Sequence, residues 1–284
     1  MHYYVTTFLC LLAVLCTGQS VRAEGFSKTK VGDLDFICIQ DSSGEFPPMV
    51  FLADADLLSK LAPSGKIPNS ISVFVVKSAQ RTVLIDTGRG RKLIENLKAA
   101  GIDPAGIDAV LITHSHGDHV DGLLAGDKPN FPNAKVWIDP KELEFWKTSS
   151  KAQYEKVVSV YGELKLIVAD EKTDVVIPEI KAVPMYGHTP GHVGFLITSK
   201  GDKMFAAGDV LHGGAVQFSH PEINARFDRD AAKSAETRLA ILKRAVEEGW
   251  RFAAVHLPFP GVGKVKKNAE REGEEGSFQF EPEK

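Results

Sequence analysis

The residues best suited to chemistry lie in the segment His114–His119, which reads HSHGDH. Three imidazoles and one carboxylate so close together are borderline ligands that suit zinc and similar divalent metals. His114 and His116 are two residues apart, so on an extended chain they point to the same side. Asp118 and His119 follow where the chain turns into a helix and can reach a second position nearby. Helix capping explains Asp118 but not three histidines, so the spacing predicts a metal site.

Three further candidates follow apolar, strand-like stretches. His188 lies in GHTPGH, Asp209 ends MFAAGD, and His256 follows FAAV. Taken singly, a histidine after a strand is more often a hydrogen-bonded surface or core residue. With the first segment, however, they supply seven ligands, enough for two metals that share a carboxylate. Such paired sites, with metals about 3.5–4 Å apart, activate a bridging water.

Strand-like and helix-like patterns alternate along the chain around these residues. Helices are expected over Arg91–Ala100, from Asp139-Pro140 onward and over Ala231–Glu248. Lys264–Glu275 is charge-rich and is expected to be a solvated loop. No linker divides the chain, so one domain is expected. Strands are expected at Ser70–Ile85 (two strands with a turn at Ser78–Arg81), Ala109–Thr113, Ile180–Val183, Gly194–Thr198, Met204–Ala207, Phe252–Val255 and Ser277–Phe280.

Composition indicates a globular protein: 43% of the 284 residues are hydrophobic and 25% are charged. The net charge of −3 lacks the basic footprint of a nucleic-acid partner. The apolar run Val5–Cys16 is too short to span a bilayer and precedes Val21-Arg22-Ala23, a cleavage pattern. Residues 1–23 are therefore predicted to be a signal peptide, with an uncleaved anchor helix as the alternative. The mature chain, 24–284, would be periplasmic or secreted and would keep Cys38 alone, so no internal disulfide is expected.

These motifs, in this order, resemble the metal-binding motifs of the metallo-β-lactamase superfamily, and Asp86-Thr87-Gly88 resembles its early D-T-G turn. The resemblance runs from about Val31 to Phe280. Several stretches are most similar to the methyl parathion hydrolase branch, which itself resembles quorum-quenching lactonases. They are Asn96–Gly101, Phe131–Ala134, Glu144–Trp146, Ala215–Phe218 and His256–Gly263.

The resemblance implies an α/β fold, the αββα sandwich, with a dinuclear site at one edge of the sheets. By position, His114, His116 and His188 would hold one metal, and Asp118, His119 and His256 the other. Asp209 would bridge the two metals. Asp86 would orient a ligand histidine, although it could also be only a turn residue before Gly88. The metals are expected to be zinc, with Mn, Fe or Co as alternatives.

The charge of two divalent ions makes hydroxide available near neutral pH, and a bridging hydroxide would attack a carbonyl carbon or phosphorus. The expected substrate is a small-molecule ester, lactone or phosphotriester. Asp118 could carry the proton to the leaving group. His212 follows Asp209 where some lactonases of the superfamily carry a substrate-contacting tyrosine, so it is either a substrate contact or structural.

Other assignments stay open. Trp146 and Tyr154 could line the substrate pocket. Alternatively, Trp146 could point from its helix into the protein core. Arg89 and Arg91 are cationic where the relatives carry a longer segment with an aromatic, which disfavours phosphotriesters. They could attract an anionic substrate or simply be solvated.

Alternative functions are a β-lactamase, a glyoxalase II-like thioester hydrolase, or a secreted metal-binding protein with an inactive site. A β-lactamase of the best-known zinc class would have a cysteine near the position of Asp209, and a glyoxalase II would need a glutathione-binding region after His256. The intact ligand set argues against an inactive site. No membrane span is expected after cleavage, and the oligomeric state, a homodimer included, is left open.

Overall fold

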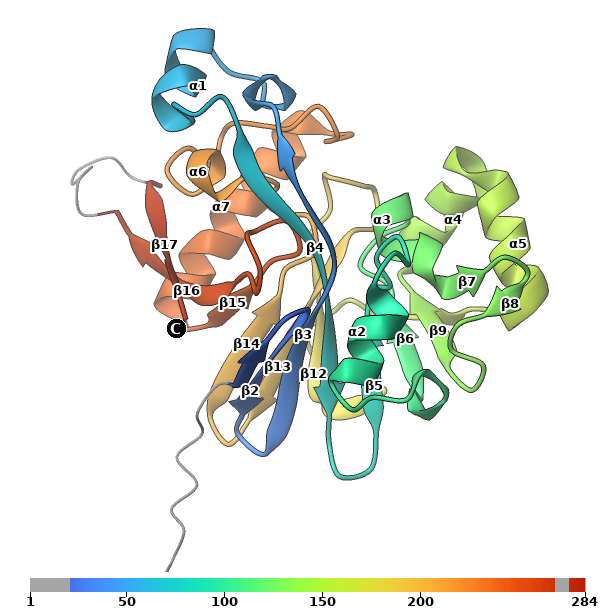
Figure 1. The fold of residues 1–284 in the computed structure, drawn as a ribbon. Coiled ribbons are helices and arrows are strands. Elements are labelled where there is room, and N and C mark those ends of the chain that lie inside the picture. The colour runs from blue at the N-terminus through green and yellow to red at the C-terminus, as the bar shows by residue number, and fades with distance from the viewer. Residues whose placement is uncertain (1–20, 269–275, 284) are drawn as a thin grey trace, which may run out of the picture.

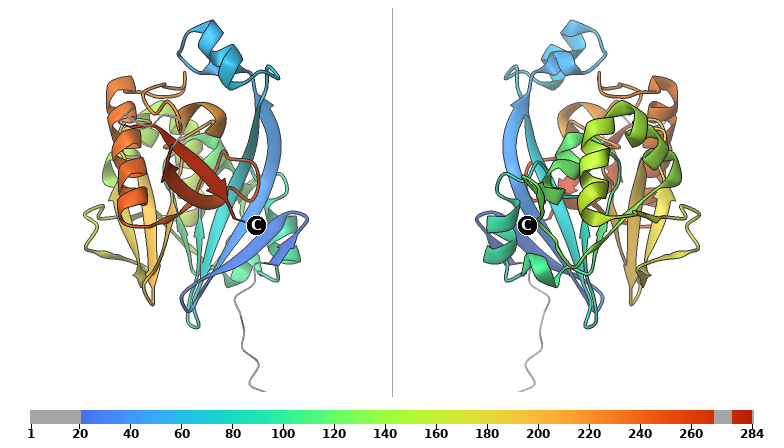
Figure 2. Two further views of the ribbon diagram at one scale, coloured as in Figure 1. Left: turned by 90° about the vertical axis from the view of Figure 1, so that its left-hand side faces the viewer. Right: turned by 90° about the vertical axis from the view of Figure 1, so that its right-hand side faces the viewer.

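The computed structural model describes residues 21–268 and 276–283 and shows two sheets packed face to face between helices (Figure 1, Figure 2). The first sheet runs, in spatial order, through β1 (Val21–Ala23), β2 (Phe26–Val31), β3 (Leu34–Phe46), β4 (Ile67–Lys77), β5 (Thr82–Ile85), β6 (Ala109–Leu111), β9 (Lys135–Ile138) and β10 (Lys165–Leu166). The second runs through β11 (Asp174–Val175), β12 (Ile177–Pro184), β13 (Val193–Ser199), β14 (Asp202–Ala206), β15 (Arg251–Ala253), β16 (Val262–Lys267) and β17 (Phe278–Pro282).

Helices cover the outer face of each sheet, which gives the αββα sandwich that the sequence predicts (Figure 2). A small hairpin of β7 (Leu124–Ala125) and β8 (Lys128–Pro129) lies beside the first sheet. The helices are α1 (Ala55–Leu61), α2 (Leu93–Ala99), α3 (Gly117–Val120), α4 (Pro140–Ser149), α5 (Lys151–Tyr161), α6 (Gly214–Gln217) and α7 (Ala231–Glu247), with 3-10 turns at Pro48–Val50, Pro104–Gly106 and Asp121–Leu123.

Three apolar layers hold the sandwich together. Between the sheets, Phe36 and Phe74 of the first sheet lie in one buried cluster with Phe195 of the second. A second layer packs the outer face of the first sheet against α2, α4 and α5, and it contains the fully buried Trp146. The third packs the second sheet against α7 and contains Trp250. Because both sheets are covered on both faces, strands such as β6 are apolar throughout.

The parallel strand pairs decide where the chain can build a site. β6 pairs in parallel with β5 and β9, and β14 pairs in parallel with β15. Parallel strands end at the same edge of their sheet, so the loops after β5 and β6 meet there, as do those after β14 and β15. The segments that carry Asp86, His114–His119, Asp209 and His256 all leave strands at this edge.

Most expected elements are confirmed within a few residues. Asp139 caps α4 by accepting a hydrogen bond from the backbone of Lys141 at 2.7 Å, with Pro140 in the first turn. The expectation of a loop over Lys264–Glu275 is wrong for its first part, because Lys264–Lys267 lie in β16. That stretch pairs with β15 and β17, and its lysines are exposed while Val265 among them is buried, so the charges stay in solvent although the segment is a strand. Residues 269–275 lie outside the described residues.

Only the last three residues of the predicted signal peptide, residues 1–23, fall within the described part of the chain. Residues 1–20 lie outside the described part, while Val21–Ala23 form β1 against β2 at the edge of the first sheet. Cys38 is buried and has no disulfide partner among the described residues. Within the same residues, no helix is both long and apolar enough to cross a bilayer.

Candidate metal centre and active site

Three histidines converge at the edge of the sandwich. His114 and His116 come from the loop after β6, and His188 from the loop between β12 and β13. Their nearest ring nitrogens form a triangle with sides of 3.1 Å (His114 Nε2 to His116 Nδ1), 3.2 Å (His114 Nε2 to His188 Nε2) and 3.0 Å (His116 Nδ1 to His188 Nε2). Asp209 Oδ2 lies 3.5 Å from His188 Nε2, so its carboxylate closes this group.

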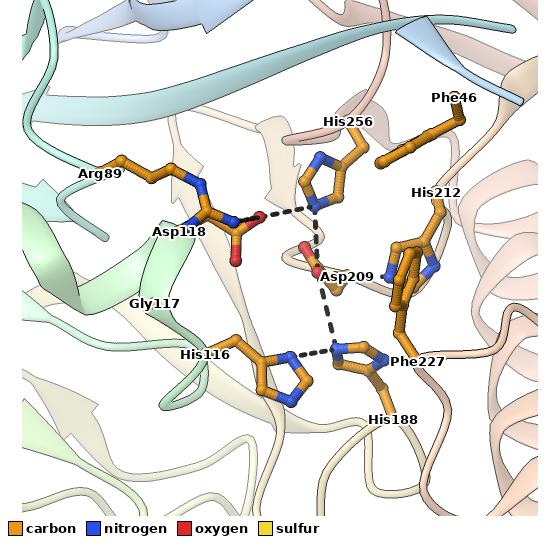
Figure 3. A pocket seen from close by; sticks show the side chains of 10 residues that line it. All are labelled: Phe46, Arg89, His116, Gly117, Asp118, His188, Asp209, His212, Phe227 and His256. Carbon is orange, nitrogen blue, oxygen red and sulfur yellow. Dashed lines mark hydrogen bonds and ion pairs between the residues drawn. The ribbon is translucent and has the colours of Figure 1, made fainter. Parts of the chain in front are cut away.

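A second group lies on the other side of Asp209. Asp209 Oδ1 is 3.1 Å from His119 Nε2, and Asp209 Oδ2 is 3.1 Å from His256 Nε2. Asp118 Oδ1 and Oδ2 lie 4.0 Å from His119 Nε2 and 3.7 Å from His256 Nε2. Figure 3 shows Asp209 at the centre, between His256 and His188. The structure thus brings together all seven ligands predicted from the sequence, in the two groups expected and with Asp209 between them.

The donor set fits two metal ions. Ligands about 2.0–2.1 Å from a tetrahedral zinc lie about 3.3 Å apart, close to the sides of the nitrogen triangle. His119 Nε2 and Asp209 Oδ1 are buried and make no hydrogen bond among the described residues, which is costly unless another partner satisfies them. These buried His/Asp clusters are therefore consistent with a dinuclear metal site.

Electrostatics keep His114, His116 and Asp209 in metal-binding protonation states, whereas His119 is held in its protonated form. Burial lowers the pKa of His114 well below its usual value and that of His116 to about 3, so both rings are neutral near pH 7 and offer lone pairs. Burial alone would raise the pKa of Asp209, but His119 and His256 hold it well below its usual value. Burial opposes the charge on His119 as well, yet Asp209 and Asp86 raise its pKa well above the usual value, so this ring would have to release a proton when a metal binds.

Asp86 orients His119, as the resemblance implies. Its Oδ2 lies 2.8 Å from His119 Nδ1 and accepts from Thr113 Oγ1 at 2.7 Å, and its Oδ1 accepts from the Thr113 backbone at 2.8 Å. This leaves His119 Nε2 facing Asp209. Asp86 also has φ of +59° in the turn after β5, so both interpretations hold. Asp41, which sequence reasoning missed, accepts from the backbones of Arg89, Lys92 and Leu93 and fixes the end of this turn.

Asp228 performs the same task for His188 and was not found from the sequence. Its Oδ1 lies 3.0 Å from His188 Nδ1, which directs His188 Nε2 to the centre. Its Oδ2 pairs at 3.1 Å with Arg238 of α7, a fully buried guanidinium that also donates to the carbonyls of Val210 and Pro221. Burial would raise the pKa of Asp228, but hydrogen bonding with His188 leaves it well below the usual range.

Replacing Asp228 with asparagine is expected to weaken metal binding about 10–100-fold, the usual effect of removing a partner that orients a ligand. The amide keeps the shape of the carboxylate but loses its charge. The measurement is a competition titration with a chromogenic chelator. Asp33→Asn, at an exposed aspartate, should behave as the unaltered protein. Equal affinities for all three proteins would contradict the role given to Asp228.

Glu142 joins the two loops that carry the first three histidines. It lies in α4 and is fully buried. Its Oε1 accepts from the backbone and hydroxyl of Ser115 at 2.8 and 2.7 Å, and its Oε2 accepts from Thr189 Oγ1 at 2.6 Å and from the Gly191 backbone at 3.1 Å. A Cβ at Gly191 would lie 2.1 Å from the Glu142 nitrogen, so this approach needs glycine. His192 lies outside the clusters of potential metal ligands, and its Nε2 accepts from the Asp209 backbone at 3.1 Å.

A pocket of about 340 Å³ opens over the centre (Figure 3). His212 reaches it, with its Nε2 3.3 Å from Asp209 Oδ2. Burial lowers the pKa of His212 to about 4, and neither ring nitrogen makes a hydrogen bond among the described residues. The lining residues are Phe46, Arg89, His116, Gly117, Asp118, His188, Asp209, His212, Phe227 and His256.

The structure does not bring Trp146 and Tyr154 to this pocket, contrary to the expectation that they line it. Trp146 is fully buried under the first sheet, and its Nε1 donates to Gln153 at 2.8 Å. Tyr154 packs against Trp146 and borders a separate hollow between α4 and α5. Their positions in α4 and α5 direct the side chains of Trp146 and Tyr154 toward the apolar layer between these helices and the first sheet. The aromatics at the metal pocket are instead Phe46 at the end of β3 and Phe227 in the loop before α7, which no periodic pattern marks.

Solved structures share this architecture. AbOPH, a hydrolase in the beta lactamase superfamily, superposes with a TM-score of 0.83 at 27% identity and covers 93% of this chain and 99% of its own. AidC, a dizinc quorum-quenching lactonase solved with a product, has a TM-score of 0.83 at 24% identity and covers 92% of this chain and 98% of its own. At that identity, the likeness to AidC shows the fold alone.

Sequence comparison leads to the same family. A hydroxyacylglutathione hydrolase of Vibrio campbellii is 26% identical over 138 residues, 48% of this chain and 47% of its own length. The chain thus spans about half the length of that curated relative. The family model described as the metallo-beta-lactamase superfamily matches residues 67–262, a range that runs from β4 to the start of β16 and contains all seven predicted ligands. The chain belongs to the metallo-beta-lactamase superfamily.

Proposed function

We propose that this protein is an exported dinuclear-metal hydrolase that opens a small-molecule ester, lactone or phosphotriester. The observation that carries the proposal is the convergence of seven buried ligands, in two groups about Asp209, beneath an open pocket. The resident ions are proposed to be zinc. AbOPH, at 27% identity, is named as a hydrolase, which supports hydrolytic chemistry at this site.

The roles of the side chains follow from their positions. Two divalent ions at this centre would supply a water activated near pH 7 and a Lewis acid for the substrate oxygen. Asp209 would be the carboxylate that the two ligand groups share. Asp118 is the carboxylate nearest the pocket opening, with a side chain 18% exposed. Burial would raise the pKa of Asp118, but His119 and His256 keep it below the usual value, so Asp118 is ionised and can accept a proton and pass it to the leaving group.

His212 is proposed to contact the substrate. Its ring is neutral near pH 7, makes no hydrogen bond among the described residues and borders the pocket, so one N–H is available to a developing negative charge on the substrate oxygen. We expect His212→Ala to lower kcat about 100-fold, the size typical of losing one such donor, while metal content stays unchanged. Steady-state kinetics and elemental analysis measure both. Retention of nearly full kcat would assign His212 a structural role, and His220→Ala is the histidine control outside the pocket.

The substrate class is tested with a hydrolysis panel on purified, metal-replete protein. The panel compares acyl-homoserine lactones, aryl lactones and esters, methyl-paraoxon-type triesters, a β-lactam and a glutathione thioester. Turnover of the first three groups that a chelator abolishes is the expected result. A strong preference for the β-lactam or the thioester would overturn the proposal. Full metal occupancy without turnover of any compound would favour a metal-binding protein.

Export is proposed from the N-terminal pattern alone. Cleavage after Ala23 would remove β1, a three-residue strand at the sheet edge whose Arg22 and Ala23 are exposed, and would leave the centre untouched. N-terminal sequencing of protein from the periplasm or medium tests this, with Glu24 as the expected first residue.

A further inference from the structure

The walls of the metal pocket differ in chemistry. Arg89 reaches in from one side, and Phe46 and Phe227 stand on the opposite side, with Asp209 between them (Figure 3). The two phenyl rings lie 5.9 Å apart, and the Phe227 side of the pocket is open, since this residue is 41% exposed. One side of the reacting centre is therefore apolar and the other is cationic.

The guanidinium of Arg89 has hydrogen-bonding capacity to spare. It lies 3.8 Å from Asp118 Oδ2 and 3.8 Å from Asp121 Oδ2, beyond the usual N–H···O distance of about 3.2 Å. Its side chain is 43% exposed and makes no hydrogen bond among the described residues. Two carboxylates thus aim the guanidinium without occupying its donors.

The backbone holds Arg89 in place independently of its side chain. The Arg89 N–H donates to Asp41 Oδ2 at 3.0 Å, and Gly88 precedes it with φ of +60°. Asp121, in turn, accepts from Gln153 Nε2 at 2.5 Å. A substitution of the Arg89 side chain therefore leaves the loop anchored.

The charges around Arg89 favour an anionic substrate group on this side of the pocket. Asp118 is a proposed metal ligand, so its charge is shared with the ion it would hold, which leaves Arg89 opposed mainly by Asp121. A planar guanidinium with free donors matches a carboxylate in two-point contact, as a neutral phosphotriester cannot.

We propose that the substrate carries a carboxylate on one side of its scissile ester bond, bound by Arg89, and an apolar group on the other side, packed against Phe46 and Phe227. This inference rests on the proposed function and narrows its substrate class. In the reaction, the acyl C–O bond breaks and the water oxygen forms the new bond to the acyl carbon, which yields a carboxylate, an alcohol and one proton. The carboxylate at Arg89 is a handle and takes no part in the bond changes.

The test uses two aryl esters that differ only at the end of the acyl chain. In 4-nitrophenyl hexanoate the chain ends in a methyl group, and in mono-4-nitrophenyl adipate it ends in a carboxylate. For the metal-replete protein we expect kcat/KM to be about tenfold higher for the adipate, mainly through KM, after subtraction of uncatalysed hydrolysis. Arg89→Gln should bring this ratio close to one, and Arg89→Lys should retain part of it.

Arg91→Gln is the matched control, because Arg91 is exposed, carries the same charge and does not line the pocket. It should leave the ratio unchanged. A ratio near one in the unaltered protein, or an equal fall in the Arg89→Gln and Arg91→Gln variants, would overturn the proposal. Because the ratio compares two substrates on one protein, a general loss of activity in a variant cancels out.

A binding measurement keeps this inference distinct from the proposed function. Calorimetric titration of the metal-replete protein with adipic acid monoanilide and with hexananilide reports the same preference without turnover. Tighter binding of the monoanilide that Arg89→Gln abolishes would support the Arg89 site even if no ester were hydrolysed. Ester turnover with equal binding of the two anilides would refute the Arg89 site and leave the hydrolase standing.

Discussion

Replacing Asp209 with asparagine is expected to lower kcat/KM by about 10³-fold or more and the bound metal from about two ions to about one per chain. Among residues 21–268 and 276–283, Asp209 is the one carboxylate in contact with both ligand groups. Its Oδ1 lies 3.1 Å from His119 Nε2 and its Oδ2 3.1 Å from His256 Nε2 and 3.6 Å from His114 Nε2. An amide has nearly the same shape but carries no charge and offers only one acceptor atom.

Elemental analysis and steady-state kinetics on the same preparation measure this effect. Asp127→Asn is the control, since the Asp127 side chain is 92% exposed and pairs with Lys156 at the surface. Asparagine at 209 with full occupancy and unchanged kcat/KM would show that the two groups do not share this carboxylate.

Replacing Glu142 with leucine is expected to destabilise the protein by about 3 kcal/mol and to lower Tm by about 6–12 °C. The leucine would leave four donors in a closed interior without their acceptor: the backbone and hydroxyl of Ser115, the hydroxyl of Thr189 and the backbone of Gly191. The same donors belong to the loops that hold His114, His116 and His188. Metal affinity should therefore fall about 10–100-fold as well.

Two companion variants separate positioning from bulk stability. Glu142→Gln keeps the volume and one acceptor oxygen, so it should recover part of both effects. Glu144→Gln lies in the same helix, but its side chain is 72% exposed, and neither property should change. Thermal unfolding with and without metal, together with chelator competition, gives the two readouts. A stability loss in Glu142→Leu with unaltered metal affinity would make Glu142 a structural residue only.

The metal ligands could be found from the sequence because their signal is local. His114–His119 is one contiguous motif, and each remaining ligand comes shortly after an apolar strand. When two strands pair in parallel, as β14 and β15 do, the residues that follow them come together at the same edge of the sheet. Asp86 was identified through the resemblance of Asp86-Thr87-Gly88 to the D-T-G turn of the family, and it directly follows β5.

The supporting residues could not be found this way. Glu142 stands near the start of α4 between two other charged residues, Lys141 and Glu144, so its residue type does not set it apart. Only tertiary packing shows that its carboxylate is buried against two loops. Asp228 and Phe227 lie in an irregular loop, where periodicity gives no orientation. Trp146 illustrates the opposite case: its aromatic type suggested a pocket, but packing against the first sheet removed it from solvent.

By itself, the sequence determined the family motifs, the seven ligands and the alternation of elements, because those features depend on residue type and spacing along the chain. The tertiary structure alone decided which side chains face the pocket, which carboxylates orient the ligands, and that Arg89 stands opposite Phe46 and Phe227. Such contacts join residues far apart in the chain, so their geometry exists only after both sheets have packed.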